Sequence, residues 1–369
     1  MTAFLKFSAW PAIAGLLAAM IILQNWILPG AASNAVVTRD TSYRGAVATA
    51  IPSVVNIYTE KVVTTRSSPM INNPLMPIPR SVPRQRIEQS LGSGVIMSES
   101  GYILTNNHVV EGADAIGVVL SDGRASSAEI VGGDRYTDLA LLKINLENLN
   151  VMELADSDYL SVGDVVLAIG NPLGFGHSVT QGIVSGLGRF SDRPGTFEGL
   201  IQTDAVIHAG NSGGALVDTN GKLIGINRLT WTATDSYNGV TGIGISLAIP
   251  SNIAEFVMDD LIRYGRVIRG WLGIEVEQVP NPNGNSRNIL RVLGVTPNGP
   301  AERAGLQPGD IITHFENEPV DDALLVMYEV SLLRPGDQLN LTVNRASAGS
   351  VDLTAVITTQ PENLGAATP

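Results

Sequence analysis

The stretch His208-Ala209-Gly210-Asn211-Ser212-Gly213-Gly214-Ala215-Leu216 contains a single serine in a glycine-rich turn that leads into an apolar run. Glycine adopts backbone conformations with positive φ and allows another backbone to approach closely. A tight turn of this kind exposes a serine hydroxyl and directs backbone N–H groups at one point, as acyl transfer requires. The turn therefore makes Ser212 a candidate nucleophile, with the N–H groups of Gly210 and Ser212 as a candidate oxyanion hole.

A serine nucleophile needs a histidine base and a carboxylate, and the chain offers both in suitable settings. His108 follows the apolar run Tyr102–Leu104, and Asp138 directly precedes the apolar run Leu139–Ile144. Histidine has an unperturbed pKa of about 6.5, so it can take the proton of a serine hydroxyl. A buried aspartate then orients the imidazole and stabilises its charged form. The order His108, Asp138, Ser212 is that of chymotrypsin-type proteases.

Each of these residues could also have a purely structural role. A single histidine is most often a core or surface residue, an aspartate beside a strand is most often a turn cap, and Gly-Ser-Gly is most often only a turn. Asp134 is a second candidate for the orienting carboxylate, although we interpret it as a turn residue. The other histidines have no comparable setting, and we interpret them as core or surface residues: His177, His208 and His314.

Composition favours short strands and excludes several classes of function. The chain has 369 residues, with 39 Gly, 20 Pro and only 16% charged residues, which suits two or three domains rich in strands and turns. A net charge of −12 disfavours nucleic-acid binding, which needs clustered Lys and Arg. The absence of cysteine excludes disulfides, thiolate metal sites and cysteine nucleophiles.

The amino terminus carries a candidate membrane anchor. Phe7 to Leu28 contains no charged residue and is long enough for a helix that spans a bilayer core of about 30 Å. Lys6, the only charge before it, places the amino terminus in the cytoplasm and the rest of the chain across the membrane. A cleaved signal peptide ending near Ala31-Ala32-Ser33 is the alternative. We expect a retained anchor, because the apolar stretch is longer than a signal peptide needs.

The rest of the chain predicts mostly strands with a few helices. Arg66 to Gln89 is rich in Pro, Arg and Ser and predicts a mobile loop. Short apolar runs then alternate with turn signals up to about residue 250, which is typical of a sandwich or of two barrels. Ser251–Tyr264 predicts a helix capped by Ser251, and a second helix is expected from about Asp322 to Leu333.

The motifs around the three candidate catalytic residues resemble those of the HtrA/Deg serine proteases. The matching segments are Thr105-Asn106-Asn107-His108-Val109-Val110, Thr137-Asp138-Leu139-Ala140-Leu141-Leu142-Lys143, Gly170-Asn171-Pro172-Leu173-Gly174, Gln202-Thr203-Asp204-Ala205 and Gly210-Asn211-Ser212-Gly213-Gly214-Ala215-Leu216. The resemblance implies a mainly β fold, with a chymotrypsin-like double β-barrel protease domain followed by one PDZ domain, behind an N-terminal transmembrane helix. It also implies a homotrimer, the triad itself, and no need of a metal or cofactor. The substrate pocket that it implies is lined by Ile207, Ile226, Asn227 and Arg228 and walled by the loop through Trp231.

The last hundred residues resemble a bacterial PDZ domain. Val295–Ile311 matches its core motif, and Gly270-Trp271-Leu272-Gly273-Ile274 matches its carboxylate-binding loop. Backbone N–H groups of such a loop hold the terminal carboxylate of a peptide, which adds as a strand to the sheet edge. We therefore expect a peptide site at Trp271, Leu272, Gly273, Ile274 and Met327. The alternative is that Trp271 and Leu272 are core residues.

These motifs predict four segments and a regulated activity. Residues 1–33 are the cytoplasmic tip and transmembrane anchor, 34–265 the protease domain, 266–359 the PDZ domain and 360–369 a disordered tail. The single PDZ domain and the anchor resemble the stress-sensor branch of the family, found in the bacterial inner membrane with its catalytic and PDZ domains in the periplasm. In that branch the PDZ domain binds exposed C-terminal peptides of misfolded outer-membrane proteins, and the protease then cleaves a membrane-spanning anti-sigma factor.

Arg189 matches an arginine that helps to transmit activation in that branch. Two other functions stay open. One is a general periplasmic quality-control protease and chaperone of the same family. The other is a non-catalytic PDZ adaptor built on an inactive protease scaffold, against which the intact triad argues.

Overall fold

The computed structural model describes residues 15, 42–66, 83–171, 176–189, 199–208, 210–230, 245–280, 288–320 and 322–361. No helix among these residues is long and apolar enough to cross a membrane. The predicted anchor lies outside the described residues except for Gly15, as does the predicted tail beyond Pro361. The chain divides into two compact units, residues 1–44 and 45–369, and every described strand belongs to the second.

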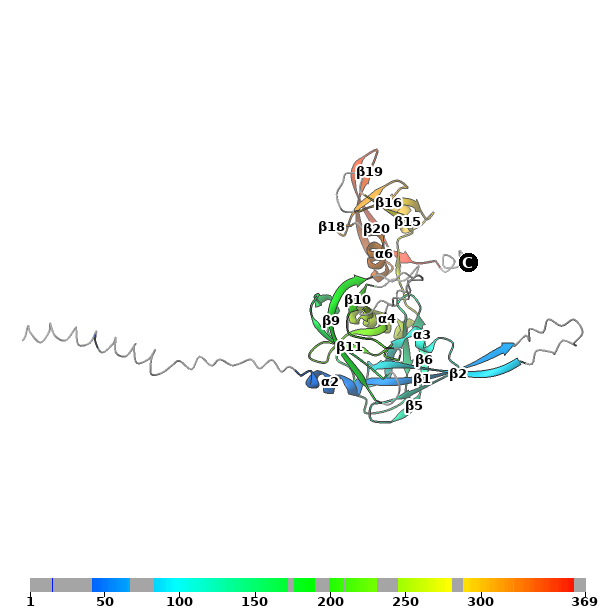
Figure 1. The fold of residues 1–369 in the computed structure, drawn as a ribbon. Helices are drawn as coiled ribbons and strands as arrows, with labels where there is room; N and C mark the ends of the chain where they lie inside the picture. Colours follow the sequence, from blue (N-terminus) through cyan, green and yellow to red (C-terminus); the bar gives the residue numbers. More distant parts are fainter. Residues whose placement is uncertain are drawn as a thin grey trace, which may run out of the picture. The chain divides into compact units, whose positions relative to one another are not determined.

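The first sheet lies between residues 54 and 143 and carries the histidine and the aspartate. Its seven strands pair antiparallel in the order β5-β4-β1-β2-β3-β7-β6. Figure 1 shows β1 and β2 side by side. The described end strands β5 and β6 are not hydrogen-bonded to each other, so this sheet is open where we expected a closed barrel. Buried aliphatic side chains such as Ile57, Ile103 and Leu142 form its core. The strands are β1 (Val54–Arg66), β2 (Pro83–Ile96), β3 (Tyr102–Asn106), β4 (Ala115–Val119), β5 (Ala125–Ser127), β6 (Glu129–Asp134) and β7 (Leu139–Lys143).

The long ribbon of β1 and β2 shows that the loop prediction for Arg66 to Gln89 was wrong over its last residues. β1 pairs with β2 along its whole length, from Val54 opposite Val95 to Arg66 opposite Pro83. Pro83 is the first residue of β2, a position where a strand tolerates proline. Cross-strand pairing with β1 therefore outweighs the local loop composition.

The second sheet closes into a six-stranded barrel in the order β10-β13-β12-β11-β8-β9. Buried small and branched side chains such as Val166, Ala168 and Ile224 fill it. The strands are β8 (Val165–Gly170), β9 (Ser178–Arg189), β10 (Leu200–Thr203), β11 (Ala215–Val217), β12 (Leu223–Thr230) and β13 (Ser246–Pro250). Smaller elements flank the two sheets: α2 (Arg44–Ala50), η1 (Ile51–Ser53) and η2 (Ser157–Tyr159).

The predicted helix after the barrel is confirmed as α4 (Ser251–Tyr264). It ends at Gly265, whose φ of 68° is the left-handed conformation that commonly terminates helices. The capping role predicted for Ser251 was wrong. Its hydroxyl donates instead to the carbonyl of Ala155 at 2.7 Å, which ties the start of α4 to the barrel.

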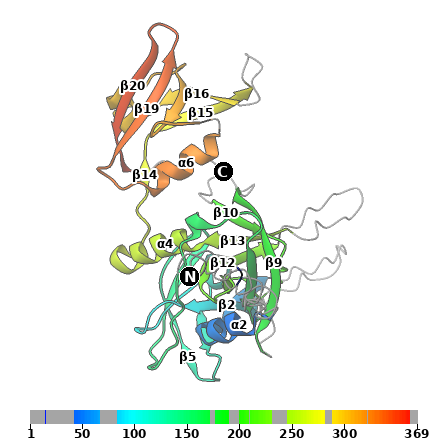
Figure 2. The same ribbon diagram turned by 90° about the vertical axis from the view of Figure 1, so that its left-hand side faces the viewer.

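The C-terminal part has a hydrophobic core of its own, formed by residues such as Leu290, Ile312 and Leu341. Its main sheet has the order β15-β16-β17-β19-β20, β18 pairs with β17, and β14 pairs separately with β21. Helix α6 packs against β14 and β15 (Figure 2). The elements are β14 (Gly270–Trp271), β15 (Ile274–Pro280), β16 (Asn288–Val295), α5 (Pro300–Ala304), β17 (Ile311–Phe315), β18 (Glu318–Pro319), α6 (Ala323–Leu332), β19 (Gln338–Arg345), β20 (Gly349–Val356) and β21 (Thr358–Thr359).

Candidate active site

His108 and Asp138 lie side by side because the strands that carry them pair. β3 ends at Asn106, which pairs with Leu139 at the start of β7. His108 follows in the short helix α3 (Asn107–Val110). Its Nδ1 atom lies 2.7 Å from Asp138 Oδ2, and its backbone N–H donates to Asp138 Oδ1 at 3.0 Å. The carboxylate therefore holds both the imidazole ring and the backbone of the histidine.

Asp138 adopts an uncommon backbone conformation that its neighbours stabilise. Its φ of 58° lies in the left-handed region. Its carbonyl accepts hydrogen bonds from the N–H of Asn107 at 2.8 Å and from the side chain of Asn106 at 3.1 Å. Burial acts to raise the pKa of Asp138, but hydrogen bonds and charge from His108, together with the charge of Arg228, hold that pKa below its usual value. The carboxylate is therefore ionised at neutral pH.

Asp134, the alternative carboxylate, is engaged elsewhere. It accepts hydrogen bonds from the backbone and the hydroxyl of Thr137. It also forms a two-point ion pair with Arg269, at 2.6 and 2.9 Å. Asp138 is thus the carboxylate that contacts His108. Of the other histidines, His177 contacts the carbonyl of Val54 through Nε2 at 2.9 Å.

Ser212 lies on the turn that precedes β11. Its hydroxyl donates to the carbonyl of Arg228 at 2.7 Å. Within the described part of the chain, no hydrogen bond joins that hydroxyl to His108. To act as the predicted nucleophile, the hydroxyl would have to leave the carbonyl of Arg228 and contact the imidazole, and catalytic hydrogen bonds often form only once substrate is bound.

The turn also leaves two backbone donors free. Among the residues that the structure describes, neither the N–H of Gly210 nor that of Ser212 has a hydrogen-bond acceptor. Gly213 has a φ of 82°, and a Cβ there would collide with the carbonyl of Ser93 and the hydroxyl of Thr105, so only glycine fits. Two free N–H groups on one tight turn are the donors that a developing oxyanion needs.

Ser93, on β2, fixes this turn to the first sheet. Its fully buried hydroxyl donates to the carbonyl of Gly210 at 2.7 Å and accepts from the N–H of Asn171 at 2.8 Å. Its own N–H donates to the carbonyl of Ser212 at 2.9 Å. Sequence analysis missed this residue. The available signal was a polar residue between two glycines, Gly92 and Gly94, directly before the apolar run Val95–Met97.

The four residues predicted to line the substrate pocket are all buried: Ile207, Ile226, Asn227 and Arg228. The amide of Asn227 donates to the carbonyls of Ile169 and Ala215, so it links β12 to β8 and β11. The guanidinium of Arg228 is directed at Asp138, with 3.2 Å between Nε and Oδ2. The pocket itself stays a prediction, and its expected wall through Trp231 lies outside the described residues.

Arg189 ends β9 and donates from Nε to the side chain of Gln202 at 3.1 Å. The residues that follow it, 190–198, lie outside the described part of the chain. Its proposed regulatory role therefore stays a prediction.

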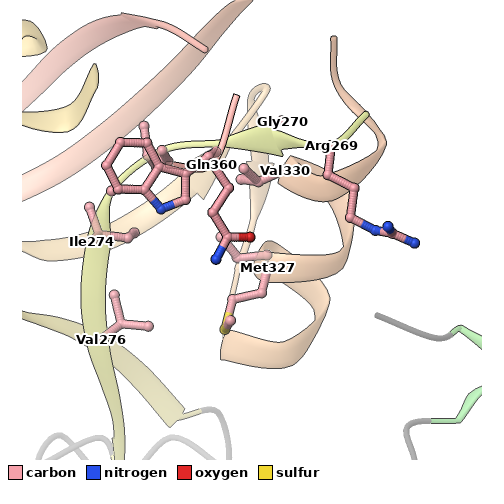
Figure 3. A pocket seen from close by; sticks show the side chains of 11 residues that line it. Arg269, Gly270, Ile274, Val276, Met327, Val330 and Gln360 are labelled. Atoms are coloured by element: carbon pink, nitrogen blue, oxygen red, sulfur yellow. The ribbon is translucent and has the colours of Figure 1, made fainter. Parts of the chain in front are cut away.

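The PDZ-like part contains a groove with a cavity of about 150 Å³. Figure 3 shows Ile274 and Val276 of β15 on one side of it and Met327 of α6 on the other. Because β15 is the end strand of its sheet, its outer edge is available to an added strand. Trp271 and Leu272 also line the groove, although Leu272 is buried in the domain core as the alternative interpretation expected.

The loop before β15 suits a carboxylate. In the described structure, the N–H groups of Leu272 and Gly273 have no acceptor, whereas their carbonyls accept hydrogen bonds from Ala301 and Thr296. Gly273 has a φ of 79°, and a Cβ at this position would press on the ring of Trp271. The loop is therefore anchored through its carbonyls and presents its N–H groups.

Comparison with known proteins matches two parts of the chain to known domain families. Residues 92–226 match the family model of the trypsin-like peptidase domain, and residues 270–358 match that of the PDZ domain. The serine endoprotease DegS of Salmonella typhimurium is 42% identical over 311 residues, which cover 82% of each chain. This chain belongs to the HtrA family. It is therefore an HtrA serine endoprotease.

Other similar proteins are also serine proteases of this kind. A probable periplasmic serine endoprotease of Marinomonas, described as DegP-like, is 38% identical over 88% of this chain and 73% of its own. Among solved structures, the HtrA-type protease AlgW with decapeptide matches with a TM-score of 0.68 and 45% identity, over 87% of this chain and 99% of that one. The serine endoprotease of Yersinia pestis matches with a TM-score of 0.61 and 40% identity, over 87% and 99%.

Proposed function

We propose that this HtrA protease is a periplasmic, membrane-anchored homotrimer that senses envelope stress. Its PDZ groove binds the exposed C-terminal peptides of misfolded outer-membrane proteins, and its protease domain then cleaves a membrane-spanning anti-sigma factor of the RseA type. The observation that carries this proposal is the combination of a hydrogen-bonded His108–Asp138 pair near a serine turn with one PDZ groove. The similarity to DegS and to AlgW solved with a decapeptide supports it.

The proposed catalytic roles are those of a serine protease triad. His108 takes the hydroxyl proton of Ser212, and the oxygen attacks the scissile carbonyl to form a tetrahedral intermediate. The N–H groups of Gly210 and Ser212 stabilise its oxyanion, and His108 then gives its proton to the leaving amine. Water repeats the sequence on the acyl-enzyme. Throughout, Asp138 orients the imidazole and stabilises its charged form.

The PDZ groove provides the sensor in this proposal. The free N–H groups of Leu272 and Gly273 receive the terminal carboxylate, and the edge of β15 pairs with the last residues of the peptide. Peptide binding can activate the enzyme only if the peptide binds the active state more tightly than the resting one. Arg189 donates a hydrogen bond to Gln202 of β10 in the protease barrel, and it is proposed to transmit this preference.

Peptide-dependent cleavage by the full-length protein tests this function. A peptide with a free C-terminal carboxylate should accelerate cleavage of the periplasmic part of an anti-sigma factor, and the same peptide with an amidated terminus should not. Ser212→Ala should abolish turnover with either peptide. Continued turnover by Ser212→Ala would overturn the site. The quality-control function suggested by the DegP-like relative would be supported by two results together. The wild-type cleavage rate would be the same with and without peptide, and unfolded proteins would be cleaved as fast as the anti-sigma factor.

A further inference from the structure

Arg228 is a buried cation that contacts two members of the triad. Its side chain is only 6% exposed, and its Nε donates to Asp138 Oδ2 at 3.2 Å. The same oxygen contacts Nδ1 of His108 at 2.7 Å. The main-chain carbonyl of Arg228 accepts a hydrogen bond from the hydroxyl of Ser212, with 2.7 Å between the two oxygens. The residue therefore acts on the carboxylate through its guanidinium and on the nucleophile through its backbone.

A β-bulge puts Arg228 in this position. Along β12 and β13, Asn227 pairs with Ala248 and Leu229 pairs with Leu247, which leaves Arg228 as the extra residue. A bulge turns its extra residue away from the regular ladder and is often found next to active sites. Here the bulge frees the carbonyl of Arg228 for Ser212 and turns its side chain toward Asp138.

The charge of Arg228 opposes the stabilisation that Asp138 gives to a protonated His108. The titratable groups that act on Asp138 are His108 from α3 and Arg228 from β12. Arginine stays protonated at every pH at which the enzyme works. By sharing Oδ2, its guanidinium offsets part of the negative charge that the imidazolium would otherwise experience. The guanidinium and the imidazole therefore compete for one carboxylate oxygen.

We propose that Arg228 is a positioning residue that extends the activity of this protease toward acidic pH and holds the resting Ser212 hydroxyl on its carbonyl. This inference rests on the triad proposed above. A unit charge whose Nε lies 3.2 Å from the oxygen that contacts the imidazole, at an effective dielectric constant of about 20, shifts a protonation equilibrium by on the order of one pH unit. Neutralising Arg228 should therefore move the acidic limb of the pH–rate profile upward by about one unit.

The pH dependence of inactivation by a fluorophosphonate tests the guanidinium, because this probe reacts with the serine without needing a substrate. We compare full-length wild type with Arg228→Gln, which removes the charge, and Arg228→Lys, which keeps it. Lys222→Gln is the matched control, since it removes one positive charge from an exposed ion pair with Glu153 in the same barrel. The acidic midpoint should rise about one unit in Arg228→Gln and stay near wild type in Arg228→Lys and Lys222→Gln.

Equal midpoints for wild type and Arg228→Gln, with the label still on Ser212, would overturn the role of Arg228 and leave the triad intact. Labelling that persists in Ser212→Ala would instead overturn the triad. If Arg228→Gln does not fold, Arg228→Met fills the same space without polar groups and carries the same expectation. A purely structural role would lower the amplitude of the profile in all Arg228 variants and leave the midpoint where it is.

Discussion

Removing the Ser93 hydroxyl is the sharpest test of how the nucleophile turn is held. Ser93→Ala deletes a fully buried oxygen that bonds to the carbonyl of Gly210 and to the N–H of Asn171. Both partners are buried, so neither gains water in exchange. Each unsatisfied buried polar group costs about 1–3 kcal/mol, so with two such groups the variant should lose about 2–6 kcal/mol of unfolding free energy. The backbone hydrogen bond from the N–H of residue 93 to the carbonyl of Ser212 remains in the variant.

The effect on catalysis should be separate from the effect on stability. Gly210 supplies one proposed oxyanion donor, and freeing its carbonyl lets that donor move. Loss of an oxyanion donor costs about 10²–10³ in rate, so a loosened one should lower kcat about 10–100-fold. KM should change by less than about threefold, because the interaction strengthens mainly in the transition state.

Denaturant unfolding and steady-state kinetics on the full-length protein measure both effects. Ser251→Ala is the matched control, since it also deletes a buried hydroxyl that bonds to a backbone carbonyl at 2.7 Å, but at the start of α4. This control should lose about 1–2 kcal/mol and keep the wild-type kcat. A wild-type kcat in Ser93→Ala, or an equal loss of kcat in Ser251→Ala, would refute the reasoning.

Three further substitutions test the carboxylate, the PDZ core and the peptide loop. Asp138→Asn should keep the fold by circular dichroism but lower kcat about 10⁴-fold, because the imidazole loses its orienting acceptor. Arg345→Met should lower the midpoint of thermal unfolding of the PDZ domain by about 5 °C or more at pH 7, because it strands the buried Asp310 carboxylate. The hydrogen bond from Arg345 holds the pKa of Asp310 below its usual value. The difference in unfolding midpoint between wild type and Arg345→Met should therefore disappear as the pH falls below about 4. Gly273→Ala should weaken peptide binding about 5–30-fold by fluorescence anisotropy, since the left-handed backbone and the ring of Trp271 both resist a Cβ.

The parts that the sequence predicted well are those in which local chemistry decides the outcome. The local placement of Ser212 on a turn and of His108 after a strand was predicted from the neighbouring residues, whereas their catalytic roles stay predictions. The bounds of α4 were predicted correctly, because apolar residues recur at helical spacing and Gly265 ends the helix.

Long-range partners account for what could not be predicted. Pro83 and its neighbours form a strand because β1 offers them a partner, although their own composition favours a loop. The hydroxyl of Ser251 reaches Ala155 instead of capping its own helix. The contact of Arg228 with Asp138 was not predicted, because it depends on a bulge whose register is set by pairing with β13. None of these contacts can be predicted from the types of the residues that make them.

Mapping the covalent adduct of a fluorophosphonate by mass spectrometry tests the triad most directly. In full-length wild-type protein, the adduct should lie on Ser212, and both Ser212→Ala and His108→Ala should abolish or strongly slow its formation. An adduct on another serine, or unchanged labelling of Ser212→Ala, would contradict the assignment of Ser212, His108 and Asp138 as the catalytic residues of this HtrA protease.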